Sequence, residues 1–435
     1  MSGNYHVQVI GGGPAGACCA LRLAEWGRRV ALEHHTRAAT PLSQETLVDS
    51  ARPLLESWGL LDLAATRWPG TPRHAVIWGD DEVRWRAGID TSPGYKVVRS
   101  EFDSVLRARA VEGGVDMVTA TSPEITAVAT GKTAPPSAGT SVTTRSLPKT
   151  VALCGVVEGV DTWTDTTVIE AVPEGGWWWL PLEDGSASLA LLADATDTRV
   201  RGIEGVVEAA RESAHGPART HAPPTWFGMN ATPRLRTSRR GEVLIGDAAS
   251  TIDPLSSQGV EKGLASAEEA AYVVNTLLTR PQDREAVLAH HRAWERDLYE
   301  AHARRALAFY AREQRFPDAA FWKTRHAALD PEPSTEDDEL PARLAPAPDL
   351  VPRTVWRRGN RVLLPEAGWT VGDAAPLSRV ADVPIASLLE LLGDGASIDD
   401  VVAAAAARPE LYLSTPKRVE GALRQLYRRG FLAGA

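Results

Sequence analysis

The chain has 435 residues, 43% of them hydrophobic, and a formal net charge of -9 at pH 7. This length accommodates a large domain and a smaller one, and the negative charge argues against a general binder of polyanions. The three cysteines have the spacing of neither a disulfide framework nor a metal site. No apolar stretch reaches the roughly 18 to 20 residues that span a bilayer, and no basic leader indicates a signal peptide. We therefore expect a cytoplasmic protein without a membrane partner.

A strand and a glycine-rich turn are predicted near the N-terminus. The strand covers 7–10, and the sequence GGGPAG at 11–16 follows it. In this motif the first glycine makes a tight turn, the second lets the backbone approach a pyrophosphate, and the third lets the helix pack closely. A second strand at 29–32 leads to an acidic residue that could bind a ribose. The candidate cofactor-binding residues here are Gly11, Gly13, Pro14, Ala15, Gly16 and Glu33.

A second glycine-bearing segment follows far along the chain. An apolar strand at 243–245 delivers Gly246 and Asp247 to the edge of a sheet, and a long alanine-rich helix opens at Gln258 and Gly259. This segment resembles that of glutathione-reductase-type flavoproteins, in which the aspartate binds the ribityl or pyrophosphate part of FAD and the helix N-terminus stabilises negative charge on the flavin. The resemblance implies FAD as the cofactor. Its candidate contacts are Gly246, Asp247, Pro254, Gln258, Gly259 and Val260.

Between these segments the chain resembles the group A flavoprotein monooxygenases and the flavin-dependent halogenases. Residues 43–62 are similar to a family segment that passes near the flavin, which makes Glu45 a candidate contact. The family motif RxxFDxxLxxxAxxxG resembles the sequence VVRSEFDSVLRARAVEGG of this chain, which makes Arg99 another candidate contact with the flavin. The alternative for Arg99 is an arginine at the end of a strand that pairs with Glu101 or Asp103. AVATGKTA resembles the family's DATGR segment, with Val128 in place of the aspartate.

Three consecutive tryptophans, 177–179, mark the predicted substrate half. In a strand Trp178 faces away from its two neighbours, so at least one indole points at the core or at a cavity. The segment resembles the WxWxIP motif of the halogenases, although Gly176 stands in place of the first tryptophan. The alternative is a sheet of packed indoles that covers the flavin pocket. No catalytic residue is assigned, and the candidates for the substrate pocket are Trp177, Trp178, Trp179 and Pro254.

One lysine bears on the choice between halogenation and hydroxylation. The halogenases use a lysine near the substrate to capture and deliver hypohalous acid. Lys96 is the only lysine before residue 132, and it lies in a strand-like stretch and not in the earlier loop. We therefore expect hydroxylation, because a flavin C4a-hydroperoxide is itself an electrophile and an indole is electron-rich. The resemblance implies O2 and a reductant, NAD(P)H or a separate flavin reductase, as co-substrates.

Two helices and a change in composition follow the second glycine segment. The helices are predicted over 263–279 and 284–315, the latter with opposite charges at spacings of three and four. The acidic, proline-rich stretch 329–352 predicts a linker or a wrapping loop. We expect no metal, because the histidines of the longer helix do not have the spacing of a ligand set. They are His290, His291 and His302.

The last part of the chain forms a small module with two predicted strands, two short helices and a final helix. Thr415 can cap the final helix and Gly430 can end it. The module resembles a winged-helix fold and the small peptide-recognition domains of enzymes that modify ribosomally made peptides. Peptide recognition, DNA binding and simple packing against the catalytic body stay open, although fusion to an acidic flavoenzyme argues against nucleic acid. The basic residues of the final helix are Lys417, Arg418, Arg424, Arg428 and Arg429.

The predicted fold class is α/β, with a glutathione-reductase-type Rossmann FAD domain, an inserted β-sheet substrate domain and a small α+β winged-helix-like C-terminal domain. The predicted ranges are about 1–75, 98–150 and 232–328 for the FAD domain, about 76–97 and 151–231 for the substrate domain, 329–352 for the linker and 353–435 for the C-terminal domain.

The chain is similar to the flavoprotein monooxygenases that mature quinohemoprotein amine dehydrogenase. This resemblance implies hydroxylation of a tryptophan within a polypeptide during biogenesis of a tryptophylquinone, by a monomer or weak dimer. One alternative is a hydroxylase or halogenase of a small aromatic metabolite. Another is a flavin-binding regulator whose winged module binds nucleic acid.

Overall fold

The structure is a computed structural model that divides into two compact units. The first comprises Met1–Gln282 and Trp294–Asp330, and the second comprises Asp283–Ala293 and Pro331–Ala435. The described residues are 4–35, 44–47, 51–68, 70, 73–85, 94–119, 122–132, 141–328, 340–372, 374, 376–380, 383–405, 408 and 416–435.

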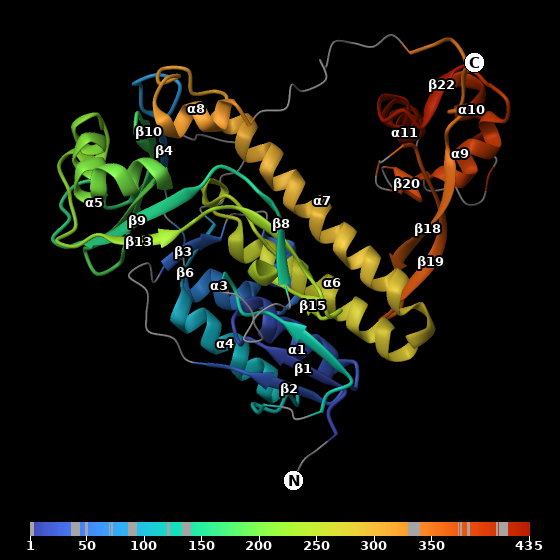
Figure 1. Cartoon of the computed structure of the whole chain (residues 1–435), viewed down its shortest axis with the longest axis horizontal. Coiled ribbons are helices and arrows are strands. Elements are labelled where there is room, and N and C mark those ends of the chain that lie inside the picture. Colours follow the sequence, from blue (N-terminus) through green and yellow to red (C-terminus); the bar gives the residue numbers. More distant parts are fainter. Residues whose placement is uncertain are drawn as a thin grey trace. The chain divides into compact units, whose positions relative to one another are not determined.

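A parallel four-stranded sheet forms the Rossmann layer of the first unit (Figure 1). Its strands, in spatial order, are β15 (Val243–Leu244), β7 (Ile125–Val128), β1 (Val7–Ile10) and β2 (Val30–Glu33). Helix α1 (Pro14–Glu25) packs against two further helices of this layer, α4 (Arg99–Glu112) and α6 (Gly259–Thr279). The strands are almost entirely apolar and buried, as is usual for a parallel sheet covered by helices.

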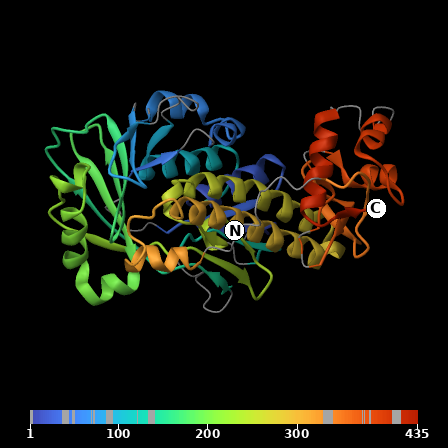
Figure 2. The same ribbon diagram turned by 90° about the horizontal axis from the view of Figure 1, so that it is seen from above.

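A seven-stranded sheet forms the other layer of the first unit (Figure 2). Its spatial order is β13 (Phe227–Asn230), β9 (Thr150–Val157), β12 (Ala187–Asp194), β11 (Gly175–Pro181), β10 (Thr166–Val172), β4 (Arg73–Ile77) and β5 (Arg84–Trp85). Helix α5 (Ala195–Glu212) covers one face, where it shares an apolar core with the sheet. The end of α7 (Arg284–Tyr310) and α8 (Ala320–His326) contribute to the core on the other face.

Smaller elements connect these two layers. A three-stranded sheet has the order β16 (Ser250–Thr251), β14 (Arg234–Ser238) and β8 (Ser141–Ser146). A two-stranded sheet pairs β3 (Gln44–Leu47) with β6 (Tyr95–Val98). The short helices α2 (Arg52–Ser57) and α3 (Leu61–Arg67) lie between β3 and β4 in the chain.

The second unit is a small α+β module with its own apolar core. Leu388, Leu423 and Leu426 are fully buried in this core. Its helices are α9 (Ile385–Leu392), α10 (Ile398–Ala405) and α11 (Pro416–Arg428). Its paired strands are β17 (Leu344–Pro346) with β22 (Leu432–Gly434), β18 (Val351–Arg358) with β19 (Leu363–Thr370), and β20 (Arg379–Val380) with β21 (Val383–Pro384).

Several predicted boundaries differ from the structure. The alanine-rich helix begins at Gly259, where the second glycine-bearing segment predicted it to open, and not at residue 263. The helix predicted to reach residue 315 ends at Tyr310, because the Glu313 carboxylate turns back to accept a hydrogen bond from the Gly79 N–H at 2.8 Å. Within the predicted linker, β17 forms and pairs with β22. Thr415, the predicted cap of α11, lies outside the described residues.

Candidate functional site

The turn between β1 and α1 has the geometry of a dinucleotide cradle. Gly11 has a φ of +116°, and a Cβ atom on it would lie 2.2 Å from the carbonyl oxygen of Ala129. A Cβ atom on Gly16 would lie 1.8 Å from the carbonyl oxygen of Gly11, whereas one on Gly13 would meet no atom within 4 Å. The first and third glycines are thus required by the protein's own packing. The second leaves space for a pyrophosphate to approach the backbone.

The two glycine segments meet at the start of α1. A Cβ atom on Gly246 would lie 2.8 Å from Cβ of Ala15, and Gly246 has a φ of +61°. Pro14 occupies the first position of α1, where its missing N–H costs no hydrogen bond. Asp247 follows Gly246 and is partly exposed. A single extended cofactor could therefore touch both segments, and the site fits FAD on this observation.

The backbone around Asp247 is held by buried polar side chains. Lys262 Nζ donates to the carbonyl oxygens of Gly246 and Ser250, both at 2.6 Å. Ser266 Oγ accepts from the Gly246 N–H at 2.8 Å. The Glu295 carboxylate accepts from Ser250 Oγ at 2.9 Å and from Ser266 Oγ, and lies 3.7 Å from Lys262 Nζ. These contacts position the turn that presents Asp247.

Glu33 ends β2 beside the glycine turn. The Gly11 N–H donates to its backbone oxygen at 2.8 Å. Its carboxylate accepts from Gln8 Nε2 at 2.6 Å, and the other carboxylate oxygen lies 2.7 Å from Nε2 of His35. The position suits a ribose ligand, and a ribose there would compete with His35, whose side chain is 73% exposed.

Arg99 is paired with two carboxylates. It is the first residue of α4, directly after the end of β6, and it pairs with Asp103, as the alternative interpretation expected. Its guanidinium contacts Glu45 at 2.6 Å and Asp103 at 3.1 Å, and the charge of Glu45 raises the pKa of Arg99. Burial raises the pKa of Asp103. Glu101 pairs with Arg67 instead. Arg99 therefore fixes β3 to α4, and its contact with FAD stays a prediction.

The loop before α6 contains the remaining cofactor candidates. The Asp253 carboxylate caps the turn Pro254–Ser256 by accepting from the Leu255 N–H at 3.0 Å, and it also accepts from the Tyr310 hydroxyl at 2.9 Å. Burial raises the pKa of Asp253. Gln258 precedes the first residue of α6. The N-termini of helices favour negative charge, and α6 begins with Gly259 and Val260.

The three consecutive tryptophans divide between the two faces of the seven-stranded sheet. Trp177 and Trp179 are buried in the core beneath α5, where their Nε1 atoms donate to the carbonyl oxygens of Ala210 and Trp163. Trp178 lies on the opposite face, which we call the substrate face. Its apolar cluster includes Trp78, Leu255, Tyr310 and Trp322. Of the three candidates, only Trp178 belongs to the same apolar cluster as Leu255, the residue after Pro254.

Lys96 reaches the end of the tryptophan strand. Its Nζ donates to the carbonyl oxygen of Pro181, the last residue of β11, at 2.9 Å. Burial lowers the pKa of Lys96, and Glu183 and Asp184 oppose that shift. The lysine thus contacts the strand that resembles the halogenase motif, a proximity that its place in the sequence did not predict.

Several residues of the site escaped prediction. Lys262, Glu295 and Tyr310 contact partners far away in sequence, so no local motif marks them. A signal is present in α6, where Lys262, Ser266 and Glu269 are buried at helical spacing within an otherwise alanine-rich sequence. Polar residues on the buried face of a helix indicate a hydrogen-bonded cluster.

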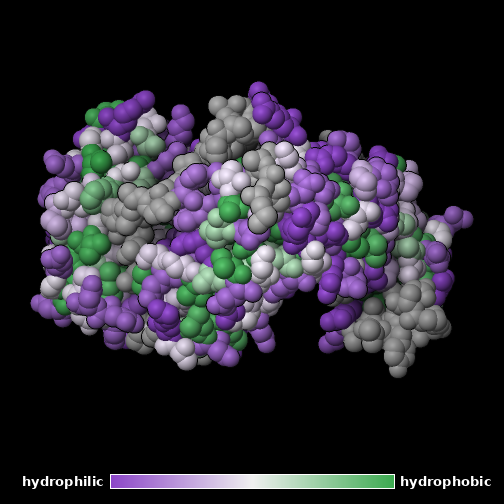
Figure 3. Space-filling model, turned by 90° about the horizontal axis from the view of Figure 1, so that it is seen from below, coloured by the Kyte–Doolittle hydropathy of each residue, from purple (hydrophilic) through white to green (hydrophobic). Residues whose placement is uncertain are grey.

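The described residues show few other features of a binding site. They contain no group of three metal-binding side chains and no helix long and apolar enough to cross a membrane. Hydrophobic residues are interspersed with hydrophilic ones on the face drawn in Figure 3. The glycine cradle and the substrate face are therefore the features on which a function can be argued.

Comparisons with known proteins agree with this geometry. Residues 137–343 match the family model described as tryptophan halogenase. The putative FAD-dependent oxidoreductase LodB of Marinomonas mediterranea is 24% identical over 377 residues, which cover 74% of this chain and 97% of LodB. Among solved structures, the peptidyl tryptophan dihydroxylase QhpG, described as essential for tryptophylquinone cofactor biogenesis, has a TM-score of 0.73 at 20% identity and covers 98% of this chain and 100% of its own. The flavin-dependent halogenase CmlS has a TM-score of 0.74 at 18% identity, covering 100% and 96%.

The predicted fold class is confirmed by these comparisons. The matched family model and the similarity to LodB agree with the predicted FAD cofactor and oxidoreductase activity. The individual cofactor contacts and the domain boundaries stay predictions.

Proposed function

We propose that this chain is an FAD-dependent monooxygenase that hydroxylates the indole ring of a tryptophan within a polypeptide, a proposal supported by the match of residues 137–343 to the tryptophan halogenase model and by the similarity of the fold to QhpG and CmlS. The observation that carries the proposal is the substrate face. Trp78, Trp178 and Trp322 gather there with Tyr310, in the same cluster as Leu255 of the loop before α6. Such a face suits an aromatic ring, because aromatic pairs add attraction beyond the burial of apolar area.

The reaction inserts one atom of O2 into an aromatic C–H bond and releases the other as water, with two electrons and two protons from a reductant. Bound FAD supplies the activation of oxygen. Gly13 leaves room for the pyrophosphate, and the Lys262 and Glu295 network holds the turn with Asp247. The aromatic side chains exclude water and orient the ring.

One relative and one feature of this chain support a polypeptide substrate. QhpG acts on a peptidyl tryptophan by its own description and covers nearly the whole of this chain. The second unit carries an exposed basic helix, α11, that could bind an extended peptide. Biogenesis of a tryptophylquinone is the process in which such a hydroxylation would take part. O2, a reductant and a tryptophan-bearing protein are the partners that this function requires.

The direct test is mass spectrometry of a tryptophan-bearing polypeptide after incubation with the FAD-loaded protein, a reductant and labelled oxygen. We expect the label in a peptide that contains tryptophan. Label found only in a free aromatic compound that is added as a competitor would overturn the proposal and favour a small-molecule hydroxylase.

Halogenation is the second candidate, and the contact between Lys96 and Pro181 favours it. A lysine with a lowered pKa is better able to react as a neutral amine. In the same assay at high halide, hydroxylation predicts a gain of oxygen without chlorine or bromine. If halogen is incorporated, Lys96→Met should abolish it, whereas hydroxylation should survive the same substitution.

A further inference from the structure

The indole of Trp78 lies over Gly176 on the substrate face. A Cβ atom on Gly176 would lie 3.8 Å from Cζ3 and 4.0 Å from Cη2 of Trp78. Gly176 stands where the WxWxIP motif has its first tryptophan. An aromatic ring therefore covers this position of β11, but the ring comes from the residue after β4. A large side chain at position 176 would need the space that Trp78 fills.

Packing, and not a hydrogen bond of its own, fixes the Trp78 ring. Its centroid lies 4.7 Å from that of Phe309, 5.2 Å from that of Trp322 and 6.2 Å from that of Tyr310. Trp78 is 5% exposed, and its Nε1 has no hydrogen-bond partner in the described part of the chain. Displacement of the ring would therefore break no hydrogen bond of its side chain. The position of the ring depends on its packing and on the backbone beside it.

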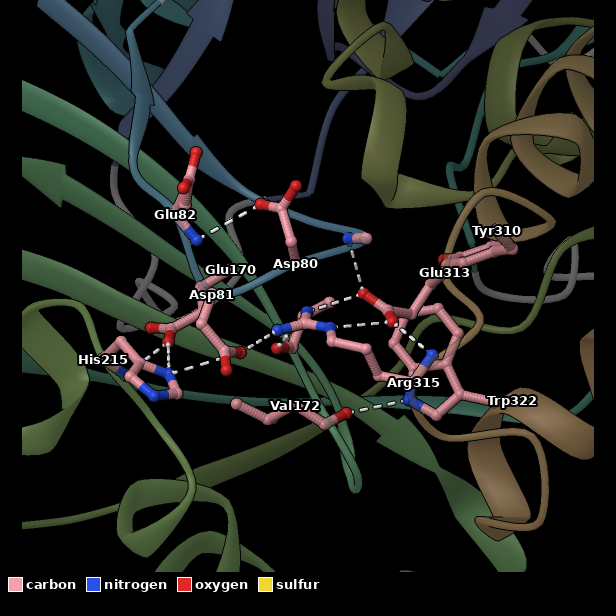
Figure 4. Close-up of polar contacts among 12 residues, drawn as sticks. Asp80, Asp81, Glu82, Glu170, Val172, His215, Tyr310, Glu313, Arg315 and Trp322 are labelled. Carbon is pink, nitrogen blue, oxygen red and sulfur yellow. Dashed lines mark hydrogen bonds and ion pairs between the residues drawn. The ribbon is translucent and has the colours of Figure 1, made fainter.

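Glu313 and Arg315 hold that backbone (Figure 4). The Gly79 N–H donates to Glu313 Oε2 at 2.8 Å. Arg315 donates to the same carboxylate through Nε at 2.9 Å and Nη2 at 2.6 Å, and its Nη1 donates to Asp81. The Glu313 side chain is fully buried. A two-bond pair between guanidinium and carboxylate has a defined geometry, so the turn that follows Trp78 is fixed in place.

Arg315 also reaches the strand beside Gly176. Its Nη2 donates to the carbonyl oxygen of Ala171 at 3.3 Å, and Ala171 is the partner of Gly176 in the ladder of β10 and β11. Trp322 Nε1 donates to the next carbonyl, that of Val172, at 2.8 Å. The same contacts thus fix the ring and the strands on which it lies.

We propose that Trp78, positioned by Glu313 and Arg315, takes the place of the side chain that Gly176 lacks and limits the size of the aromatic ring that the substrate face admits. The inference rests on the proposed function in one respect, namely that an aromatic ring binds on this face. Trp78 is the specificity-determining residue, and Glu313 and Arg315 are positioning residues.

The test compares the binding of two probes, indole and the larger carbazole, to the FAD-loaded protein. Binding is followed by the change in flavin absorbance, so no turnover is needed. Trp78→Ala should improve the affinity for carbazole relative to indole by about tenfold, because it opens a volume that only the larger ring fills. Trp85→Ala, a tryptophan 46% exposed in the same sheet, is the matched control and should leave the ratio unchanged.

A reciprocal exchange separates ring size from general damage. Gly176→Trp alone should weaken both probes and lower the Tm, because two indoles would compete for one space. The double variant Trp78→Ala with Gly176→Trp should recover the wild-type ratio of affinities and much of the Tm. A double variant no better than Gly176→Trp alone, or an unchanged ratio in Trp78→Ala, would overturn the proposal.

The positioning role has its own measurement. Arg315→Met should shift the carbazole to indole ratio in the same direction as Trp78→Ala, and Arg315→Lys should shift it less. If Arg315→Met lowers the Tm but leaves the ratio unchanged, the arginine is only structural.

The outcomes are distinct from those of the proposed function. A shifted ratio together with failure to oxidise any polypeptide would leave Trp78 as the size limit of an enzyme for small aromatic compounds. Absence of binding by both probes to the wild-type protein would contradict an aromatic site on this face.

Discussion

The ammonium group of Lys262 lies 3.7 Å from the carboxylate of Glu295, and the two side chains are 0% and 3% exposed. Charges buried this deeply require each other, because removal of one leaves the other without compensation. Lys262 also bonds the carbonyl oxygens of Gly246 and Ser250, which lie on either side of Asp247 in sequence. The pair therefore links the stability of the first unit to the shape of its cofactor turn.

We expect Lys262→Met to lower the free energy of unfolding by about 3 to 5 kcal/mol and to weaken FAD binding. Urea unfolding of the apoprotein and titration with FAD would measure the two effects separately. Lys323→Met, on the exposed surface of α8, is the control and should change stability by no more than about 0.5 kcal/mol. Wild-type stability and FAD affinity in Lys262→Met would contradict this role of the pair.

Gly13 and Gly16 of the first turn should respond differently to the same added methyl group. Gly13→Ala should leave the apoprotein as stable as wild type, because its Cβ atom would meet no protein atom within 4 Å. It should reduce FAD affinity by roughly 10- to 100-fold, because the methyl group would occupy the approach of the pyrophosphate. Gly16→Ala should instead destabilise the apoprotein by about 1 to 3 kcal/mol or more, because of its contact with Gly11.

Thermal unfolding without FAD and fluorescence titration with FAD would distinguish the two variants. Gly421→Ala, in α11 with no atom within 4 Å of its Cβ, is the control, which should leave FAD affinity unchanged and should not lower the Tm, because alanine favours a helix interior. Full FAD affinity in Gly13→Ala would remove the main structural support for the cradle.

These glycines were predictable because a local pattern dictates local backbone geometry. The order of strand, turn and helix gave each glycine a separate role, and the positive φ of Gly11 and the close contact of Gly16 agree with it. The alternation of side chains in a strand likewise placed Trp178 opposite Trp177 and Trp179.

Contacts between distant segments could not be predicted in this way. Trp78 lies over Gly176, and Glu313 binds Gly79, because the fold brings these segments together. The charge pattern of α7 continues beyond Tyr310 and overestimated the length of that helix, since helical spacing carries no information about the tertiary contacts that end it. A single sequence therefore revealed the cofactor cradle but not the side chains that support it.

His302 should make the stability of the protein depend on pH. Burial, with Arg305 and Lys262 nearby, lowers the pKa of His302 from 6.5 to about 4. The unfolded chain then binds a proton between these values that the folded chain does not, so stability is fully present above the unfolded pKa and falls on acidification. We expect this histidine to contribute a loss of roughly 1 to 3 kcal/mol between about pH 7 and about pH 4.5.

Urea unfolding across this pH range, in wild type and in His302→Gln, would measure the contribution. The carboxylates of Asp253 and Glu170 have raised pKa values because they are buried, and they act in the opposite direction, since their contribution is lost as pH rises. They are present in both proteins, so the difference between the two curves isolates the histidine. Parallel curves would show that His302 does not titrate in this way.

The exposed face of α11 is the remaining site to test, because it bears on the polypeptide substrate. Arg424 is 46% exposed and pairs with Glu420 at 2.8 Å. Arg428 is exposed one turn further along the helix. Charges at the rim of an interface change the rate of association and its salt dependence more than they change folding. The pair Arg304 and Glu300 of α7 has the same spacing at 3.9 Å and provides a matched control.

Reversing the charge of Arg424 and Arg428 to glutamate should weaken binding of a tryptophan-bearing protein substrate by about 10-fold or more at low salt, with a smaller effect at high salt, because screening removes the attraction. Both FAD content and oxidase activity without substrate should equal those of wild type, and Arg304→Glu should bind substrate normally. Binding measured by titration across a range of salt checks these outcomes. Unchanged substrate affinity at every salt concentration would show that α11 is not the recognition surface. Loss of salt-dependent retention on DNA, with unchanged binding of protein, would instead assign this helix to nucleic acid.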